Sequence, residues 1–208
     1  MTRLDIIKIL INKFKFKSYL EIGVRNGTVI NNINIEKKDG VDPAGNCNYI
    51  MTSDKFFEQL PKETKYDLIF IDGLHEYRQS VRDVSNSLNH LSKNGIIVMH
   101  DCNPPTKWHQ REPGEYNGTG KWNGTVWKSF IEHRKNRKDL TMFVVDCDWG
   151  VGIIKEKSKT KFPEIIVKEE DNVLDYEWLD KNRKMALNLI DGKKFMEWIN
   201  KEQDSEYY

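Results

Sequence analysis

Hydrophobic and polar positions along the chain predict helices and strands that alternate. Over residues 4–16 the apolar side chains recur at helical spacing while the lysines fall elsewhere, which indicates an amphipathic helix. Short, continuous apolar runs follow, and most of them end in an acidic residue or a glycine. The predicted strands are 18–24, a short strand that stops at 42, 66–73, 95–101, 140–146 and 150–156. The predicted later helices are 54–60, 76–91, 127–134 and 177–201.

These strands lack polar alternation, which is typical of parallel strands that are buried on both faces by helices. Alternating strands and helices therefore favour an open, doubly wound α/β sheet. The last two strands, 140–146 and 150–156, are too close in sequence for a helical crossover, so we expect them to pair as an antiparallel hairpin. Residues 177–201 follow as a helical tail, and we expect this tail to dock on the outside of one α/β domain.

Composition narrows the classes of partner and compartment. The 208 residues carry 33 Lys and Arg against 32 Asp and Glu, so a net charge of +1 provides no global field to attract nucleic acid or an anionic membrane. No window approaches the ~18 uncharged apolar residues of a membrane span, and the first residues lack a secretory signal pattern. Three widely spaced cysteines form neither a disulfide framework nor a zinc pattern. We expect a cytoplasmic protein with no nucleic-acid partner.

Acidic residues stand at four successive strand ends: Glu21, Asp42, Asp72 and Asp101. Any one of them alone could be a turn or cap residue. Ligands of open α/β sheets bind outside the carboxyl ends of the strands, near the switch in strand order. Four acids at successive ends therefore favour a binding site at this edge.

The segment YLEIGVRNGT departs from the nucleotide-binding glycine fingerprint. Gly23 and Gly27 are present, but Arg25 stands where another glycine is usual. The spacing between Glu21 and Asp42 is about the spacing at which a second carboxylate reaches the ribose hydroxyls of a bound nucleotide. This spacing favours a nucleoside ligand without separating a nicotinamide dinucleotide from other nucleosides.

Together the segments YLEIGVRNGT, GVDP, YDLIFIDGLHEY and GIIVMHDCNPP, followed by the strand hairpin, resemble a class I S-adenosylmethionine (SAM)-dependent methyltransferase. Within that superfamily the chain most resembles the group that includes macrolide-sugar and glycan O-methyltransferases. The resemblance spans roughly residues 18–156. It implies a Rossmann-like three-layer sandwich around a seven-stranded sheet that is parallel except for its last strand. The expected organisation is a methyltransferase domain over 1–157, with an N-terminal helix at 1–17, and a C-terminal helical extension over 158–208 packed on it.

The resemblance also implies a set of residues for SAM. These residues are Glu21, Gly23, Gly27, Asp42, Ser53, Asp54 and Asp72. The first three would surround the methionine part, and Asp42 would hold the ribose hydroxyls. Ser53 and Asp54 occupy the stretch that usually meets adenine.

Methyl transfer is an in-line displacement that needs an aligned oxygen nucleophile and removal of its proton. By resemblance, His75 is the candidate base, with Asp72 beside it; the alternative is a histidine that caps the next helix. A divalent cation, Mg²⁺ or Mn²⁺, held by Asp72 and Asp101 would acidify the acceptor hydroxyl. Cys102 follows Asp101 directly, and a thiolate is a poor partner for Mg²⁺, so Asn103 or a water would have to substitute as ligand.

The long segment 103–124 is rich in Pro, Gly and aromatic residues, and loops of this length are often functional lids. Its aromatic side chains are suited to stacking on sugar rings, or they simply anchor the loop to the domain. His100 either orients Asp101 or faces the acceptor. The candidate acceptor residues are His100, Asn103, Trp108, His109 and Trp122.

The sequence thus predicts a SAM-dependent O-methyltransferase that acts on a hydroxyl of a sugar or glycan, with a divalent metal as a candidate aid. Two alternatives remain open: an O-methyltransferase of a phenolic or other small natural product, and a SAM-binding module that has lost catalysis. The helical tail either covers the domain's own sheet or forms a homodimer contact.

Overall fold

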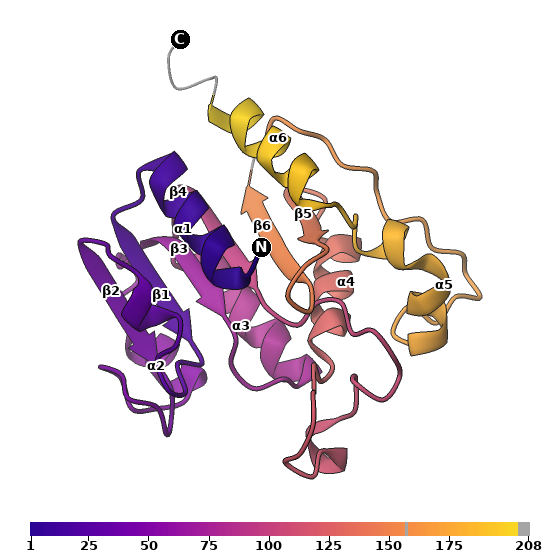
Figure 1. Ribbon diagram of the computed structural model, residues 1–208, viewed down its shortest axis with the longest axis horizontal. Helices are drawn as coiled ribbons and strands as arrows, with labels where there is room; N and C mark the ends of the chain where they lie inside the picture. Colours follow the sequence, from indigo (N-terminus) through magenta and orange to yellow (C-terminus); the bar gives the residue numbers. More distant parts are fainter. Residues whose placement is uncertain (157, 204–208) are drawn as a thin grey trace.

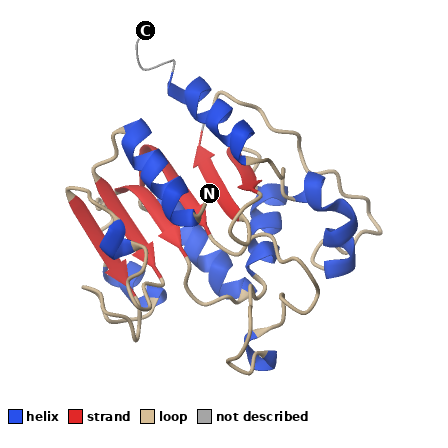
Figure 2. Ribbon diagram, in the orientation of Figure 1, coloured by secondary structure: helices blue, strands red, loops and turns tan. Residues whose placement is uncertain are grey.

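A computed structural model describes residues 1–156 and 158–203, which form a mixed sheet between two layers of helices (Figures 1 and 2). The sheet has six strands in the order β2-β1-β3-β4-β6-β5. The strands are β1 (Ser18–Ile22), β2 (Lys37–Val41), β3 (Tyr66–Ile71), β4 (Leu91–Met99), β5 (Leu140–Val145) and β6 (Val151–Glu156).

Every neighbouring pair among β1 to β4 is parallel, and β6 runs antiparallel to both β4 and β5. The predicted hairpin of the last two strands is therefore confirmed. The direction of strand order reverses between β1 and β3, because β2 lies on one side of β1 and the later strands lie on the other. The carboxyl ends of β1 and β3 meet at this switch point, where ligands of such sheets bind.

Helices cover both faces of the sheet. The helices are α1 (Arg3–Phe14), α2 (Ser53–Gln59), α3 (Tyr77–Asn89), α4 (Val126–Asn136), α5 (Tyr176–Ala186) and α6 (Gly192–Gln203), with short 3-10 turns η1 (Ile30–Asn32) and η2 (Pro113–Glu115). Buried side chains of α1 and α6 share one apolar cluster, and those of α2 to α5 share the other. No helix in the described part of the chain has the length and apolar character to cross a bilayer.

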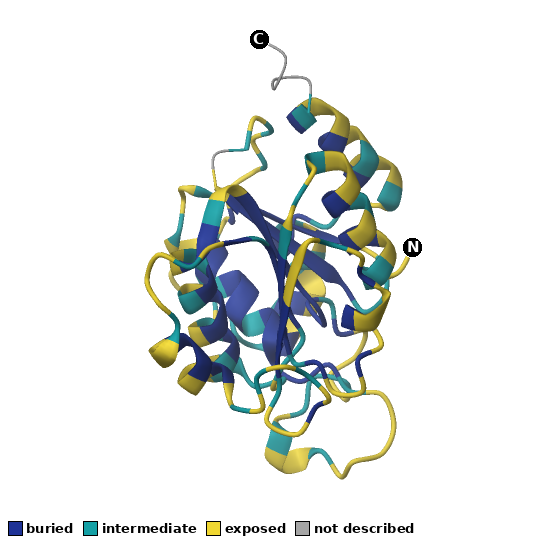
Figure 3. Ribbon diagram, turned by 90° about the vertical axis from the view of Figure 1, so that its left-hand side faces the viewer, coloured by how far each residue is buried: buried dark blue, intermediate teal, exposed yellow. Residues whose placement is uncertain are grey.

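The sheet divides the core into these two clusters, since successive side chains of a strand point to opposite faces. In β3, Ile69 and Ile71 belong to the cluster under α2 to α5, whereas Leu68 and Phe70 belong to the cluster under α1 and α6. All four are buried. The buried strands form the centre of the molecule in Figure 3, and exposed positions lie on the outer sides of the helices and in the loops. The apolar runs predicted as doubly buried strands thus have apolar neighbours on both sides.

The seven-stranded sheet that the resemblance implied is wrong, because the described residues form six strands. The apolar runs themselves indicated six. Between β2 and β3, residues 42–65 hold a loop, helix α2 and a turn, and no further strand fits there. The seventh strand was expected only by analogy with the family, and this short connection does not contain it.

The single helix predicted over 177–201 is also wrong, because the structure divides it into α5 and α6. Asn188 adopts a left-handed conformation with φ of 44°. Ile190 then pairs with Val145 at the edge of the sheet. Helical periodicity continues across this break, so it could not reveal a tertiary pairing that interrupts the helix. The expected domain boundary at 157 and the last residues of the extension, 204–208, lie outside the described residues.

Helix α1 begins next to the carboxyl edge of the sheet. Thr2 and Asp5 form a capping box, in which Asp5 N–H donates to the Thr2 hydroxyl at 3.3 Å and Thr2 N–H donates to Asp5 at 2.8 Å. Such a box satisfies free backbone donors of the first turn and fixes where the helix starts. It therefore fixes the position of Arg3, the first residue of the helix.

Gly23 lets the turn after β1 pass close to the end of β3. Its φ is +88°, and a Cβ at this position would lie 2.1 Å from the carbonyl oxygen of Asp72. Both the backbone conformation and the lack of space require glycine. This close approach brings the glycine turn against the residue that begins the candidate site.

We expect Gly23→Ala to destabilise the protein by about 3 kcal/mol or more, because it adds a backbone clash to the strain of a left-handed alanine. The matched control is Gly118→Ala. Gly118 also has a positive φ, of +79°, but nothing lies within 4 Å of its added Cβ. Its loss should be about 1 kcal/mol. Urea denaturation of both variants measures the difference, and equal losses would show that the approach to Asp72 is not tight.

Candidate functional site

Acidic and histidine side chains meet where β3 and β4 end. Asp72 follows β3, His100 and Asp101 follow β4, and His75 lies in the turn before α3. One ligand atom from each of Asp72, His75 and Asp101 lies within 4.8 Å of the others. The structure thus brings together two of the four acids that the sequence placed at strand ends, because parallel strands deliver their carboxyl ends to one edge.

His75 presents one ring nitrogen to both acids. Its Nε2 lies 3.4 Å from Asp72 Oδ1 and 3.3 Å from Asp101 Oδ2. Its Nδ1 is buried and has no hydrogen-bond partner among the described residues. Burial alone would lower the pKa of His75, but the hydrogen bond to Asp72 and the charges of Asp101 and Asp72 outweigh burial and raise it. In the neutral form of His75, with Nε2–H donating to the acids, Nδ1 carries the free lone pair.

His100 is enclosed by acceptors on both sides of its ring. Nδ1 lies 2.9 Å from Asp101 Oδ2 and 3.2 Å from Asp72 Oδ1, and Nε2 lies 2.8 Å from the carbonyl oxygen of Asp148. Burial would lower the pKa of His100, but the charge of Asp72 and the hydrogen bonds to Asp101, Asp148 and Asp72 raise it well above its ordinary value. Two nitrogens that both face acceptors require two protons, so we assign His100 as an imidazolium.

Arg3 adds a second cation from the start of α1. Its Nη1 lies 3.4 Å from Asp72 Oδ2 and 2.6 Å from each ring nitrogen of His100, and its Nε lies 3.6 Å from Asp148 Oδ2. Burial would raise the pKa of Asp72, but the charge of His100 and hydrogen bonds from His100 and His75 hold it well below its usual range. The hydrogen bond from His100 lowers the pKa of Asp148 to about 2. The carboxylates therefore hold two adjacent cations together.

The loop after β4 closes on the same acids. The buried amide of Asn123 donates from Nδ2 to Asp101 Oδ1 at 2.7 Å, and Asn123 Oδ1 has no partner among the described residues. Trp122 stacks on His75 with ring centroids 5.0 Å apart and on Tyr116 at 4.4 Å. This end of the loop therefore covers the ring of His75 and binds Asp101.

Asp72 and Asp101 are spaced as metal ligands could be, but their oxygens are already engaged. Asp72 Oδ2 faces Arg3, and Asp72 Oδ1 faces the two histidines. Asp101 Oδ1 accepts from Asn123, and Asp101 Oδ2 faces the same two histidines. A hard dication seeks free carboxylate oxygens and retains water. It would have to displace Arg3 and the imidazolium, so this donor set does not fit Mg²⁺ or Mn²⁺ as it stands.

Cys102 does not contribute a ligand either. Its side chain is fully buried and lies against Gly152 and the core, and burial strongly raises the pKa of its thiol. Asn103 is also engaged elsewhere: its Nδ2 donates to Asp146 Oδ1 at 3.1 Å, and its Oδ1 accepts from Arg183. The substitution of Asn103 for a third metal ligand, considered from the sequence, therefore has no support in these contacts.

The glycine turn and Asp42 form a second part of the edge. Arg25 adopts a glycine-like φ of 50°, and its N–H donates to Asp42 Oδ2 at 2.7 Å. Asp42 Oδ1 accepts from Ala44 N–H at 2.8 Å. The arginine at a glycine position thus follows the left-handed path and fixes the carboxylate that was predicted to meet a ribose.

Ser53 and Asp54, predicted near adenine, are tied to helix α3. The Ser53 hydroxyl donates to Asp83 Oδ1 at 2.6 Å, and Asp54 pairs with Arg82 Nε at 3.2 Å. Neither side chain contacts the acids that follow β3 and β4 in any recorded hydrogen bond or ion pair. Their adenine role stays a prediction.

The candidate acceptor residues divide into two groups. Trp122 lies over His75, whereas Trp108 is 52% exposed and lies against the Arg111 guanidinium, 3.5 Å from the ring centroid. His109 Nδ1 lies 2.8 Å from the Thr106 hydroxyl, and its ring packs near Trp149. The aromatic residues of this loop therefore form stacks of their own, of which only the Trp122 end contacts His75.

Three residues of the site were missed from the sequence: Arg3, Asn123 and Asp148. Arg3 reaches Asp72 across 69 positions of the chain, and Asn123 lies 22 positions from Asp101. Asn123 follows Trp122 in the long loop, which was the only signal available for it. An arginine in the first turn of a surface helix carries no such signal.

Glu21 is 2% exposed and accepts a hydrogen bond from the Tyr19 hydroxyl at 2.6 Å. Burial, opposed by the Tyr19 hydrogen bond and assisted by the negative charge of Asp72, raises the pKa of Glu21 to about 8. Glu21 is therefore largely protonated at neutral pH. Any ligand that places a cation beside it would favour its ionised form.

Comparison with known proteins gives one family match. Residues 34–102 match the family described as "Methyltransferase domain". This segment includes Asp72, His75 and Asp101. No curated protein sequence matches the chain significantly.

Solved structures share the fold at low identity. An O-methyltransferase from Bacillus cereus in complex with S-adenosylhomocysteine (SAH) is 12% identical, with a TM-score of 0.55, over 74% of this chain and 80% of that one. The O-methyltransferase TomG from Streptomyces achromogenes is 11% identical, with a TM-score of 0.54, over 74% and 79%. The methyltransferase PaMTH1 from Podospora anserina is 16% identical, with a TM-score of 0.54, over 74% and 78%. The chain therefore has a Rossmann-like methyltransferase fold, and residues 34–102 within it match a methyltransferase domain.

We expect Glu21→Gln to change how stability depends on pH. A carboxyl whose pKa rises from 4.5 to about 8 on folding stabilises the protein fully below pH 4.5, and this stabilisation is lost as the pH rises towards 8. Between pH 5 and 8, the free energy of unfolding of the wild type should therefore fall relative to that of the variant, by up to about 1.4 kcal/mol per pH unit. Urea denaturation over this range measures it.

The control is Glu58→Gln, which removes one carboxylate from the exposed side of α2. Parallel pH profiles for the wild type and Glu21→Gln would show that Glu21 is ionised at neutral pH in the folded protein.

Proposed function

We propose that this protein is a SAM-dependent O-methyltransferase that acts on a hydroxyl of a sugar or glycan. The observation that carries the proposal is the setting of His75: one ring nitrogen faces two carboxylates, and the other has no partner among the described residues. This arrangement leaves a lone pair for a proton from the acceptor.

The donor would lie along the carboxyl ends of β1 and β2, next to His75. Gly23 and Gly27 have positive φ and make the turn there, and Asp42 follows β2. Glu21 lies at the end of β1, close enough to Asp72 for its pKa to respond to that charge. Two fold neighbours support this donor: TomG in complex with SAM and the O-methyltransferase from Bacillus cereus in complex with SAH.

In the proposed reaction the acceptor oxygen attacks the methyl carbon of the sulfonium as the carbon–sulfur bond breaks. The electron pair of that bond stays on sulfur, and the sulfonium becomes the neutral thioether of SAH. The hydroxyl proton passes to Nδ1 of His75. Asp72 and Asp101, which accept from Nε2–H, stabilise the imidazolium that forms.

The loop over the site supports an acceptor with a ring. Trp122 and Tyr116 stack with an interplanar angle of 6°, and the Trp122 indole donates to the carbonyl oxygen of Arg111 at 2.8 Å. Trp122 lies between Tyr116 and His75, so a sugar ring would stack on the face of Trp122 that is freed when the loop moves off His75. Since Trp122 covers His75, the loop must shift for the acceptor to enter.

We expect His75→Ala to lower methyl transfer by about 10²- to 10⁴-fold, the usual contribution of a general base. The assay incubates protein and SAM with a panel of sugars, glycans and catechols, and measures SAH by mass spectrometry. SAH binding, measured by calorimetry, should be retained by the variant. The control is Leu74→Ala, which alters an exposed neighbour that is 56% accessible.

Each contrary outcome has its own meaning. Full methyl transfer by the His75→Ala variant would show that His75 is not the base. SAH binding by the wild type without transfer to any acceptor would support an inactive binding module, and transfer to catechols alone would replace the sugar acceptor. No binding of SAM or SAH by folded protein would contradict the whole proposal.

We further propose that the transfer needs no divalent cation, because Arg3 and His100 already supply positive charge to Asp72 and Asp101. We expect the rate to be unchanged by EDTA, and Mn²⁺ titration followed by electron paramagnetic resonance to detect no tight site. Arg3→Gln combined with His100→Asn should create Mn²⁺ binding by freeing oxygens of Asp72 and Asp101, whereas Arg3→Lys should not. Loss of transfer in EDTA and its recovery with Mg²⁺ would contradict this second proposal alone.

A further inference from the structure

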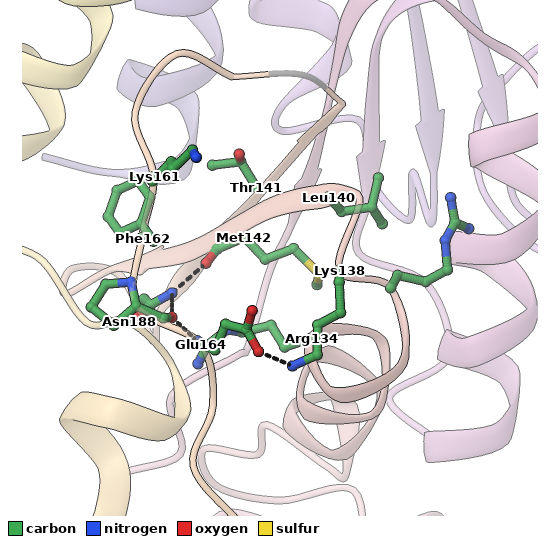
Figure 4. Close-up of a pocket in the computed structure, with 11 residues that line it drawn as sticks. Arg134, Lys138, Leu140, Thr141, Met142, Lys161, Phe162, Glu164 and Asn188 are labelled. Atoms are coloured by element: carbon green, nitrogen blue, oxygen red, sulfur yellow. Dashed lines mark hydrogen bonds and ion pairs between the residues drawn. The ribbon is translucent and has the colours of Figure 1, made fainter.

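A hollow of about 290 Å³ lies at the edge of the sheet opposite the candidate site (Figure 4). β5 runs parallel to β4, because both are antiparallel to β6, so its first residue, Leu140, lies at the edge away from Asp101. The walls are the end of α4, the start of β5, the segment 161–164 and Asn188. We call this feature the basic hollow.

Positive charge dominates its lining. Four basic residues and one acidic residue, Glu164, line it. Lys138 pairs with Glu164 at 3.1 Å, and Arg137 pairs with Asp139 at 2.6 Å. Arg134 and Lys161 form no ion pair with a carboxylate among the described residues. The basic hollow therefore holds two cations that no side-chain anion balances.

Arg134 is a buried cation, only 6% exposed. Its Nη1 donates to the carbonyl oxygens of Met185 and Ala186, and its Nη2 donates to that of Pro163. These three hydrogen bonds use part of the five N–H donors of a guanidinium. Carbonyl dipoles offset its charge only partly, and a buried charge gains most from an ionic partner.

Neutral hydrogen-bonding groups complete the lining. The Thr141 side chain borders the basic hollow beside Lys161, as Figure 4 shows. The Asn188 amide donates to the carbonyl oxygen of Met142 at 3.0 Å, which fixes its position. At about 290 Å³, the hollow is near the lower limit of ligand pockets. It suits a small anion better than a large organic ligand.

We propose that the basic hollow binds a phosphate group, carried by a small molecule or as the free ion. The anion would lie between the two unbalanced cations, Arg134 on α4 and Lys161 on the segment that leads to the C-terminal helices. Hydrogen bonds between a charged donor and an anion are stronger than hydrogen bonds between neutral groups. Binding would therefore hold this segment against α4 and stabilise the fold.

Calorimetric titration with inorganic phosphate at constant ionic strength tests the proposal, in the absence of SAM. We expect saturable binding and a rise in melting temperature with phosphate concentration. Lys161→Ala should weaken binding about tenfold, and Glu164→Gln should strengthen it several-fold because it removes the one acid of the lining. Arg134 is left intact because its bonds to three carbonyl groups hold the fold.

The matched control is Lys159→Ala, an exposed lysine two positions away that does not line the basic hollow. It should bind phosphate as the wild type does. Absence of saturable binding would overturn the proposal, and so would equal weakening by Lys159→Ala and Lys161→Ala, because that indicates diffuse attraction. Titrations with sulfate and pyrophosphate then rank these anions by their affinity for the basic hollow. None of these readouts depends on methyl transfer.

Discussion

A buried cluster of opposite charges at the ends of β3 and β4 organises the carboxyl edge of this sheet. Asp72 and Asp101 lose hydration there, and a buried carboxylate needs nearby cations or donors to remain ionised. The structure supplies them from distant parts of the chain: Arg3 from the first helix, His100 from β4, and Asn123 from the long loop. These contacts with Asp72 and Asp101 therefore fix the positions of the three segments at this edge of the sheet.

This constraint explains why the loop after β4 follows a defined path. Asn123 is fully buried and binds Asp101, and Thr125 N–H donates to the carbonyl oxygen of His75 at 3.0 Å. Between them, Gly124 passes so close to His75 that a Cβ would lie 2.0 Å from its carbonyl oxygen. The loop is therefore attached to the site on both sides of Gly124, and movement that admits an acceptor must come from the part before Asn123.

Much of the fold and half of the site could be predicted from the sequence, for one physical reason. Apolar runs report burial, and acids directly after such runs must meet at one edge when the strands are parallel, so the meeting of Asp72 with Asp101 was predictable. The contribution of Arg3 could not be predicted, because no pattern in its helix indicates which edge of the sheet the first turn contacts. The break at Asn188 was hidden for the same reason: pairing of Ile190 with Val145 is a tertiary event. Analogy with a family failed at residues 42–65, which contribute no strand to the sheet.

Two histidines share the same two carboxylates, yet their surroundings separate their chemistry. Both ring nitrogens of His100 face an oxygen, Asp101 Oδ2 at Nδ1 and the Asp148 carbonyl at Nε2, so a proton on each nitrogen stabilises the folded state. His75 has acceptors on one side only. A proton on its Nδ1 therefore has no protein partner, while the carboxylates at Nε2 still favour positive charge on the ring. This combination suits a group that must take up a proton during a reaction and release it afterwards. His100, whose pKa is raised well above its ordinary value, places positive charge beside it.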